Sequence, residues 1–146
     1  MKIKDILSAK GNDVKSILTD KTVQDAIQML VDNRIGSLVV MDAEGKVVGI
    51  ITERDILRLS KQFGPDMFGK KVGEVMTTNL IVCEGKDDIE YAEKVMIEKR
   101  IRHLPILENG RLIGLISIGD IVKTLLKDSK IEIKYLRDYV EGNYPG

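Results

Sequence analysis

The sequence has few of the residues that form covalent or aromatic sites. It contains one cysteine, no tryptophan, two phenylalanines and four tyrosines among 146 residues. A single cysteine excludes an internal disulfide and fits a reducing compartment. So few aromatic side chains argue against stacking platforms for single-stranded nucleic acid. Isoleucine, leucine, valine and methionine must therefore form the core.

A net charge and a long apolar run are also missing. The 23 lysines and arginines balance the 23 aspartates and glutamates, so no field favours nucleic acid or an anionic membrane. The longest apolar run, near residues 37–41, is far shorter than a membrane span, and the first ten residues are too charged for a signal peptide. We therefore expect a cytoplasmic protein that binds neither nucleic acid nor membrane.

Motifs of the common enzyme classes are missing as well. The chain has no Gly-x-x-x-x-Gly-Lys-[Ser/Thr] loop, no Gly-x-Gly-x-x-Gly turn and only one histidine beside its single cysteine. Phosphate-loop, Rossmann and Cys/His zinc chemistry lack their residues. Solvation or helix capping explains the paired carboxylates of Asp87 and Asp88. The sequence predicts no enzyme, no catalytic residue and no metal site.

What the chain does contain is one internal repeat. Residues 23–41 align with 89–107 and residues 45–57 with 110–122, with a one-residue difference in the turn between them. Nine pairs are identical: Ala26/Ala92, Arg34/Arg100, Ile35/Ile101, Leu38/Leu104, Gly45/Gly110, Gly49/Gly114, Ile51/Ile116, Asp55/Asp120 and Ile56/Ile121. Similarity at this level predicts two copies of one supersecondary unit.

Each copy changes its periodicity in the same order. An amphipathic helix begins at residue 23 or 89, with Thr22 as the cap of the first. Two strands follow, at 38–41 and 47–51 in copy one and at 104–107 and 112–116 in copy two, each pair joined by a glycine-containing turn. A second helix starts near 56 or 121, and a short extended piece precedes each copy at 14–17 or 80–83. The predicted fold is α/β (α+β), with two units that pack together through a pseudo-two-fold axis because one alone is too small.

Composition also divides the chain. Gly64, Pro65 and Gly69 mark a linker over residues 61–71. We expect one domain at residues 1–62, a second at 72–128 and a helical tail at 129–146, which begins with a capping box at Ser129. The apolar face of that tail covers either its own domains or a second subunit.

Both copies end in the pattern Gly-h-h-[Thr/Ser]-x-x-Asp, where h is apolar. At a strand end that enters a helix, the hydroxyls of Thr52 and Ser117 and the first-turn amides can bind phosphate. Asp55 and Asp120 are then placed to accept hydrogen bonds from ribose hydroxyls. The alternative is that each motif is an ordinary helix cap, worth about 0.5–2 kcal/mol.

Two adjacent potential cations precede the first hairpin strand of copy two. Arg102 can offer a bidentate fork to phosphate, and His103 can donate a hydrogen bond. Copy one has Gly36 and Ser37 at these positions, so the two halves are not equivalent. For a lone histidine, a satisfied surface or core position is the alternative.

The segments "RIGSLVVMDAEGKVVGIITERDI" and "RIRHLPILENGRLIGLISIGDI" resemble a tandem pair of CBS domains, a Bateman module, a family named after cystathionine β-synthase. The resemblance covers about residues 3–126. It implies β-α-β-β-α units packed sheet to sheet, a homodimer, and AMP, ADP, ATP, S-adenosylmethionine or NADH in the cleft between repeats, where ATP can bring Mg²⁺. One implied half-site combines Lys15, Ile35 and Gly36 with His103, Ser117 and Asp120, and the other combines Ile81, Ile101 and Arg102 with Ser37, Thr52 and Asp55.

The resemblance implies a regulatory, signal-transducing module. A ligand held across the repeat can regulate an unknown partner protein if it binds two conformations with different affinity. The alternative function is a ligand-free scaffold that uses only its interaction surface.

Overall fold

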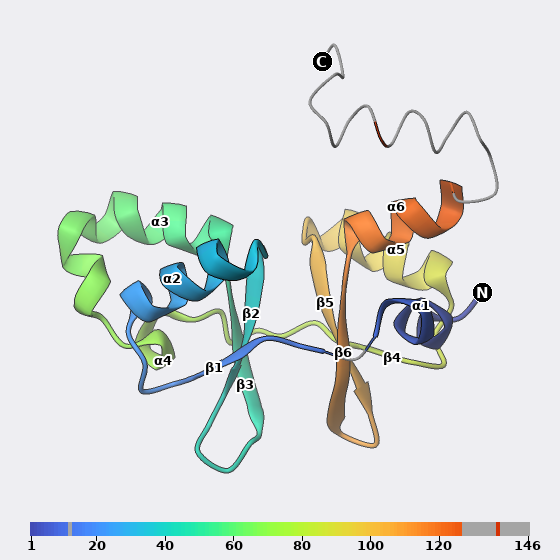
Figure 1. Ribbon diagram of the computed structural model, residues 1–146, viewed down its shortest axis with the longest axis horizontal. Coiled ribbons are helices and arrows are strands. Elements are labelled where there is room, and N and C mark those ends of the chain that lie inside the picture. Colours follow the sequence, from blue (N-terminus) through green and yellow to red (C-terminus); the bar gives the residue numbers. More distant parts are fainter. Residues whose placement is uncertain (12, 127–136, 138–146) are drawn as a thin grey trace. The chain divides into compact units, whose positions relative to one another are not determined.

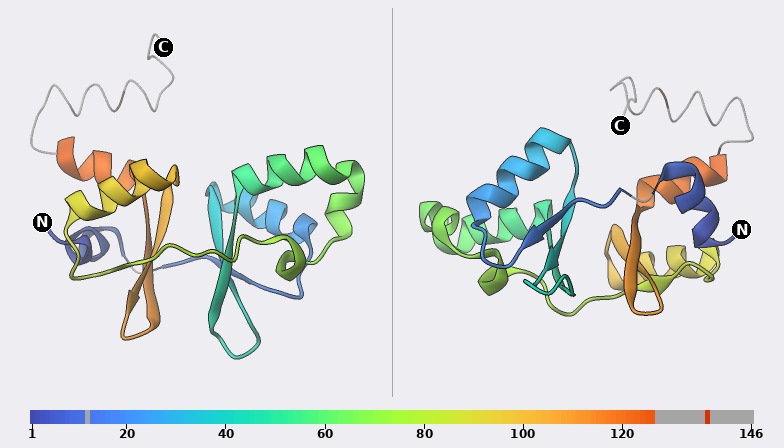
Figure 2. Two further views of the ribbon diagram at one scale, coloured as in Figure 1. Left: turned by 180° about the vertical axis from the view of Figure 1, so that it is seen from behind. Right: turned by 60° about the horizontal axis from the view of Figure 1, so that its bottom comes forward.

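The computed structural model describes residues 1–11, 13–126 and 137. The described chain forms two compact units, the copy-one unit with residues 13–82 and 107–113 and the copy-two unit with residues 1–11, 83–106 and 114–126. Each unit contains a three-stranded sheet with its helices on one face (Figures 1 and 2). The predicted tail helix at 129–146 lies, Arg137 apart, outside the described residues.

The copy-one unit follows the predicted order of elements. It contains β1 (Ser16–Leu18), α2 (Val23–Asn33), β2 (Ser37–Met41), β3 (Val47–Thr52), α3 (Glu53–Phe63), the 3₁₀ helix η1 (Gly64–Gly69) and α4 (Val72–Val75). Strand β2 is central, parallel to β1 and antiparallel to β3. Its register places Ser37 opposite Thr52, so the start of β2 lies beside the motif at the end of β3.

The copy-two unit repeats this arrangement. It contains α1 (Ile3–Lys10), β4 (Cys83–Glu84), α5 (Ile89–Lys99), β5 (His103–Glu108), β6 (Arg111–Ser117) and α6 (Ile118–Leu126). Strand β5 is central in the order β4-β5-β6. The predicted α/β class with two repeated β-α-β-β-α units is therefore confirmed.

The segments between the repeats contain regular structure. Within residues 61–71, which the sequence marks as a linker, α3 continues to Phe63 and η1 follows it. Met67 of η1 is 7% exposed and packs with Val23 and Leu59, so this stretch contributes to the core. The extended piece predicted at 80–83 forms a strand only from Cys83. The domain limits at 1–62 and 72–128 stay a prediction.

The segment that leads into each repeat packs in the unit of the other repeat. In the copy-two unit, the amides of Ile3 and Lys4 on α1 donate to the carbonyls of Asp87 and Gly85, each at 2.9 Å. In the copy-one unit, Val72 and Gly73 on α4 donate to Lys21 and Thr19 at 2.7 and 3.0 Å. The acceptors are equivalent positions of the repeat, so α1 and α4 are equivalent elements that sequence periodicity did not reveal.

Apolar side chains of the sheet and helices fill each core. In the copy-one unit the buried cluster joins all three strands to α2 and α4, through Ile17, Ala26, Leu30, Leu38, Val40, Ile51 and Val72. Helices α2 and α5 both end at an arginine with left-handed backbone, Arg34 at φ 53° and Arg100 at φ 56°. A left-handed residue satisfies the last helical carbonyls and turns the chain toward the central strand. The repeat thus extends to backbone detail.

Candidate functional site

The copy-one motif lies where β3 passes into α3. Thr52 is the N-cap of α3, and its hydroxyl accepts a hydrogen bond from the Asp55 amide at 3.2 Å. The Asp55 carboxylate accepts in return from the Thr52 amide at 2.9 Å. This reciprocal pair is a capping box, which satisfies two backbone amides at the start of the helix. The copy-one motif is therefore a helix cap, which is the alternative to a phosphate site that the sequence left open.

Asp55 has more contacts than a surface cap needs. The residue is 8% exposed and is one of two buried polar or charged residues in the described part of the chain. Its Oδ1 accepts from the Thr77 hydroxyl at 3.1 Å and lies 3.4 Å from Arg58 Nη2. Thr77 follows α4, so the lead-in segment brings a hydroxyl to this carboxylate. Burial of a carboxylate requires such partners.

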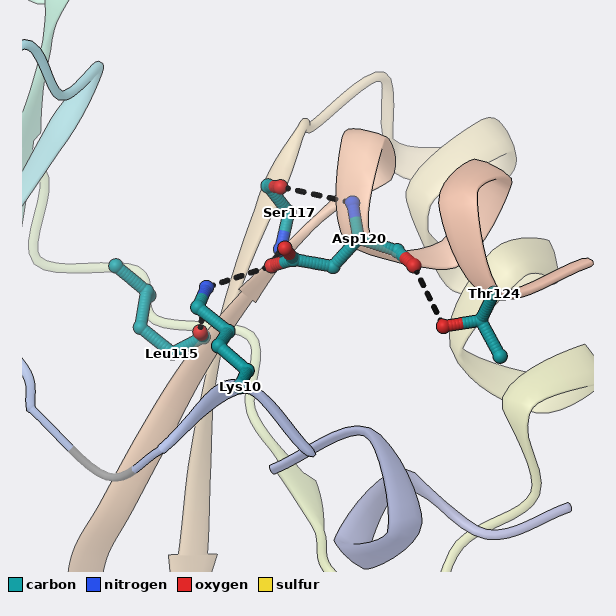
Figure 3. A network of polar contacts seen from close by, with 5 residues as sticks. All are labelled: Lys10, Leu115, Ser117, Asp120 and Thr124. Carbon is teal, nitrogen blue, oxygen red and sulfur yellow. Dashed lines mark hydrogen bonds and ion pairs between the residues drawn. The ribbon is translucent and has the colours of Figure 1, made fainter. Parts of the chain in front are cut away.

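The copy-two motif has the same backbone geometry at the junction of β6 and α6 (Figure 3). Asp120 Oδ2 accepts from the Ser117 amide at 2.8 Å, and the Ser117 hydroxyl accepts from the Asp120 amide at 3.1 Å. The carboxylate of Asp120 has a different side-chain partner from the carboxylate of Asp55. Lys10, the last residue of α1, donates from Nζ to Asp120 Oδ2 at 2.6 Å and to the Leu115 carbonyl at 2.8 Å.

The electrostatics of Asp120 follow from these partners. Burial by itself would raise the pKa of Asp120, because it penalises the charged carboxylate. The hydrogen bond from Lys10, the amide of Ser117 and the positive charge of Lys10 act in the opposite direction and hold the pKa of Asp120 below its ordinary value. The carboxylate is therefore ionised at neutral pH and available as an acceptor.

Gly36 and Arg102, which the sequence placed in the site, have equivalent backbone roles. The Gly36 carbonyl accepts from the Glu53 amide at 3.0 Å, and the Arg102 carbonyl accepts from the Ile118 amide at 2.9 Å. Each bond ties the start of the central strand to the first residue of the helix that carries the motif. Arg102 is exposed. Its backbone thus lies next to the Ser117–Asp120 motif of its own unit, and its side chain is outside the core.

Ser37 and His103 follow these two residues at the start of β2 and β5. Ser37 is 2% exposed, and its hydroxyl has no hydrogen-bond partner among the residues that the structure describes. His103 is half-buried. The structure brings Ser37 together with Thr52 and Asp55 in one unit, and His103 together with Ser117 and Asp120 in the other.

The predicted adenine contacts are on strand ends and turns. Lys15 is exposed immediately before β1 and forms an ion pair with Asp13 at 3.3 Å. Ile35 and Ile101 are half-buried and close the turns after α2 and α5, where their amides donate to Leu30 and Met96. Ile81 is half-buried ahead of β4. Their contribution to the motif of the other repeat stays a prediction.

Sequence reasoning missed the residues that α1 and α4 bring to the motifs, Lys10 and Thr77. The signal was present in the glycine of each motif. A Cβ at Gly49 would lie 2.5 Å from Met76 Sδ, and a Cβ at Gly114 would lie 2.5 Å from Leu7 Cδ2. Both glycines therefore lie where a lead-in segment approaches closely, and an alignment of residues 3–10 with 72–79 would have shown the equivalence.

No three metal-binding side chains come together among residues 1–11 and 13–126. In the same part of the chain no helix has the length and apolarity to cross a membrane. The chemistry that the two motifs offer is thus hydrogen bonding: hydroxyl and carboxylate oxygens gathered at a helix N-terminus. Such a group can bind a polyhydroxylated anion.

The repeated β-α-β-β-α units define the class of protein as a tandem pair of small α/β modules. The family model described as CBS domain matches residues 3–62 and 72–127, and the chain belongs to the CBS-domain family. The mitochondrial CBS domain-containing protein CBSX3 of Arabidopsis thaliana is 33% identical over 150 residues, which cover 97% of this chain and 73% of that protein. The predicted tandem CBS pair is confirmed.

Solved structures agree with this assignment. A CBS-domain containing protein from Agrobacterium tumefaciens is 39% identical with a TM-score of 0.83, covering 85% of this chain and 92% of that one. CBSX2, solved in complex with AMP, is 27% identical with a TM-score of 0.74 and covers 87% and 97%. A CBS domain pair solved with 5′-methylthioadenosine and S-adenosyl-L-methionine is 25% identical with a TM-score of 0.78 and covers 88% and 98%.

Enzymes are also among the relatives. An inosine-5′-monophosphate dehydrogenase from Methanocaldococcus jannaschii is 40% identical over 114 residues, which cover 76% of this chain and 21% of the enzyme. Four fifths of that enzyme thus lie outside the match, so the similarity carries no dehydrogenase activity to this chain.

Proposed function

We propose that this protein is a regulatory module that binds an adenosine-containing ligand through its two Gly-h-h-[Thr/Ser]-x-x-Asp motifs. One observation carries the proposal: in both repeats a hydroxyl, a carboxylate and the first amides of a helix are gathered at the end of the third strand of the sheet. Helix N-termini favour phosphate, and a paired carboxylate accepts ribose hydroxyls. Two solved relatives that hold AMP, or 5′-methylthioadenosine with S-adenosyl-L-methionine, support this ligand class.

The assignment of roles follows the chemistry of each side chain. Asp55 and Asp120 accept from ribose, while Thr52, Ser117, Arg102 and His103 contact phosphate. The adenine ring contacts Lys15, Ile35, Gly36, Ile81 and Ile101. The Ser37 hydroxyl lies at the copy-one motif, buried and without a partner among the described residues, and a bound ligand would supply the hydrogen bond that it lacks.

Isothermal titration of the nucleotide-stripped protein tests the proposal. The panel contains AMP, ADP, ATP with and without Mg²⁺, S-adenosylmethionine and NADH. We expect saturable binding of at least one, weakened by about 1.5–3 kcal/mol in Asp120→Asn, because the substitution removes a charge-assisted hydrogen bond. Asp88→Asn is the matched control, since Asp88 is also an N-cap residue, at α5, but lies outside both motifs.

A ligand-free scaffold is the second candidate function. The observation that favours it is that both motifs already form hydrogen-bonded helix caps, so neither needs a ligand to satisfy its amides. The same titration separates the two functions. No saturable binding by any compound, with the thermal unfolding transition intact, would reject the nucleotide module and leave the scaffold as the remaining candidate.

We also propose a homodimer. The helices of the two repeats expose apolar side chains at equivalent positions. Val31, which is 68% exposed, aligns with Ile97, which is 66% exposed. Leu57, which is 71% exposed, aligns with Val122, which is 36% exposed. Surface of this kind, repeated in both units, suits a second copy of the same chain. Sedimentation equilibrium should give twice the chain mass, and Val31→Lys combined with Ile97→Lys should give the monomer. A wild-type monomer would contradict the dimer.

A further inference from the structure

Lys10 donates a hydrogen bond to Asp120, the residue that we propose accepts from the ribose hydroxyls in copy two. Its Nζ is 2.6 Å from Asp120 Oδ2, the oxygen that also accepts from the Ser117 amide (Figure 3). A second bond, to the Leu115 carbonyl at 2.8 Å, fixes the ammonium against β6. A ribose hydroxyl that takes Oδ2 must therefore compete with a positive charge, and one that takes Oδ1, which has no described partner, lies beside that charge.

The equivalent carboxylate of copy one has a longer cationic contact, an ion pair with Arg58 at 3.4 Å, against 2.6 Å from Lys10 to Asp120. Asp55 Oδ1 accepts from the neutral hydroxyl of Thr77 at 3.1 Å and lies at 3.4 Å from the guanidinium of Arg58. The residue of α1 at the position of Thr77 is Ser8, whose hydroxyl donates to its own helix, to the Lys4 carbonyl at 2.9 Å. Lys10, two residues further, replaces it at the carboxylate.

This difference has a consequence for ligand choice. Displacement of Lys10 breaks a charge-assisted hydrogen bond, which is about twice as strong as a neutral one. A ligand with a phosphate offers the displaced ammonium a new anionic partner, whereas a neutral nucleoside offers none and a sulfonium cation repels it. Lys10 can make this exchange because its side chain is 38% exposed and lysine carries its charge on a flexible four-carbon stem.

We propose that Lys10 is a specificity-determining residue of the copy-two site, which selects adenosyl ligands that carry a phosphate over neutral and cationic ones. The inference rests on the proposed nucleotide-binding function and names its ligand class. In the ligand-free protein Lys10 neutralises Asp120, and in the complex it pairs with the phosphate.

The test compares AMP with adenosine, which differ only in the phosphate. Isothermal titration is carried out on the wild-type protein, on Lys10→Met and on Lys4→Met, which removes one charge from an exposed position of the same helix. In Lys10→Met the ratio of AMP affinity to adenosine affinity should fall about tenfold, which is 1.4 kcal/mol, with adenosine binding more tightly than it does to wild type. Lys4→Met and Lys10→Arg should keep the wild-type ratio.

The outcomes distinguish failure of this inference from failure of the proposed nucleotide-binding function. An unchanged ratio in Lys10→Met, with AMP still bound, overturns the role of Lys10 and leaves the nucleotide module intact. If neither AMP nor adenosine binds wild type, this inference is overturned; the proposed function is overturned with it only if no compound of the wider nucleotide panel binds. Lys10→Gln is a second uncharged replacement, so that a folding defect of one variant does not decide the result.

Discussion

Gly114 lies directly against Leu7: a Cβ on the glycine would come within 2.5 Å of Leu7 Cδ2 and 2.9 Å of Cδ1. Gly49 has the same relationship to Met76, with the addition of the Thr77 carbonyl oxygen at 2.9 Å from the added Cβ. The contacts connect strands of each repeat with the lead-in segment that brings Lys10 or Thr77 to the motif. Packing at these glycines thus positions the candidate site.

Substitution of either glycine by alanine should destabilise the fold. We expect a loss of about 1–3 kcal/mol, the range for overpacked cores. Gly49→Ala should cost more than Gly114→Ala, because the end of a leucine side chain can move while the Thr77 carbonyl is bonded to the Ile50 amide. Urea denaturation measures the difference. Gly69→Ala is the control, since a Cβ there meets nothing within 4 Å, and equal stability of all three variants would refute the argument.

Removal of the copy-one cap should also be measurable. Thr52→Ala removes the oxygen that accepts from the Asp55 amide and should lower the free energy of unfolding by about 1 kcal/mol. Thr52→Ser keeps that oxygen and should retain most of the stability. If the alanine and serine variants unfold at the same urea concentration, the cap makes no contribution.

The pH dependence of stability should report the environment of Asp120. Its pKa is lower in the folded protein than in the unfolded chain, so its stabilising effect is complete above the ordinary carboxyl pKa and is lost as the pH falls through the folded-state pKa. Asp120→Asn should therefore be less stable than wild type at pH 7, with a gap that narrows on acidification. Thermal unfolding between pH 7 and pH 3 tests this. A stability difference between wild type and Asp120→Asn that grows toward low pH would contradict a lowered pKa of Asp120.

Cys83 should be unreactive in the folded protein. Burial in apolar surroundings, with a smaller effect from the charge of Asp87, raises the pKa of Cys83 to about 11, so almost no thiolate is present at pH 8. We expect slow reaction with a thiol reagent under native conditions and rapid reaction of one thiol in guanidinium chloride. Rapid labelling of the native protein would contradict this burial.

The repeat, the helices and the hairpins could be predicted because each has a local signal. Thr22 was predicted as a cap and accepts from the Asp25 amide at 3.2 Å, and the turns of both hairpins contain the predicted glycines, Gly45 and Gly110, at positive φ. Caps and turns depend on residues within a few positions of one another, so a short stretch of sequence is enough to predict them.

The partners of the two aspartates could not be predicted in the same way. Lys10 is 110 positions from Asp120 in the chain, and Thr77 is 22 positions from Asp55. No periodicity links residues so distant, and α4 is only four residues long, too short to produce a helical pattern. The packing of the linker could not be predicted for a related reason: Gly64 and Pro65 mark a break between helices, but only the folded structure shows that Met67 packs with Val23 and Leu59.

The placement of α1 has a consequence for how the protein is made. Its amides bond to Gly85 and Asp87, and Lys10 at its end bonds to Asp120, so α1 has none of these partners until the chain has been synthesised past residue 85. The copy-one unit can gather α4 as soon as residue 77 has emerged. Nascent chains should therefore acquire the first sheet early, whereas α1 docks late, after a loop closure that spans about eighty residues and slows this step.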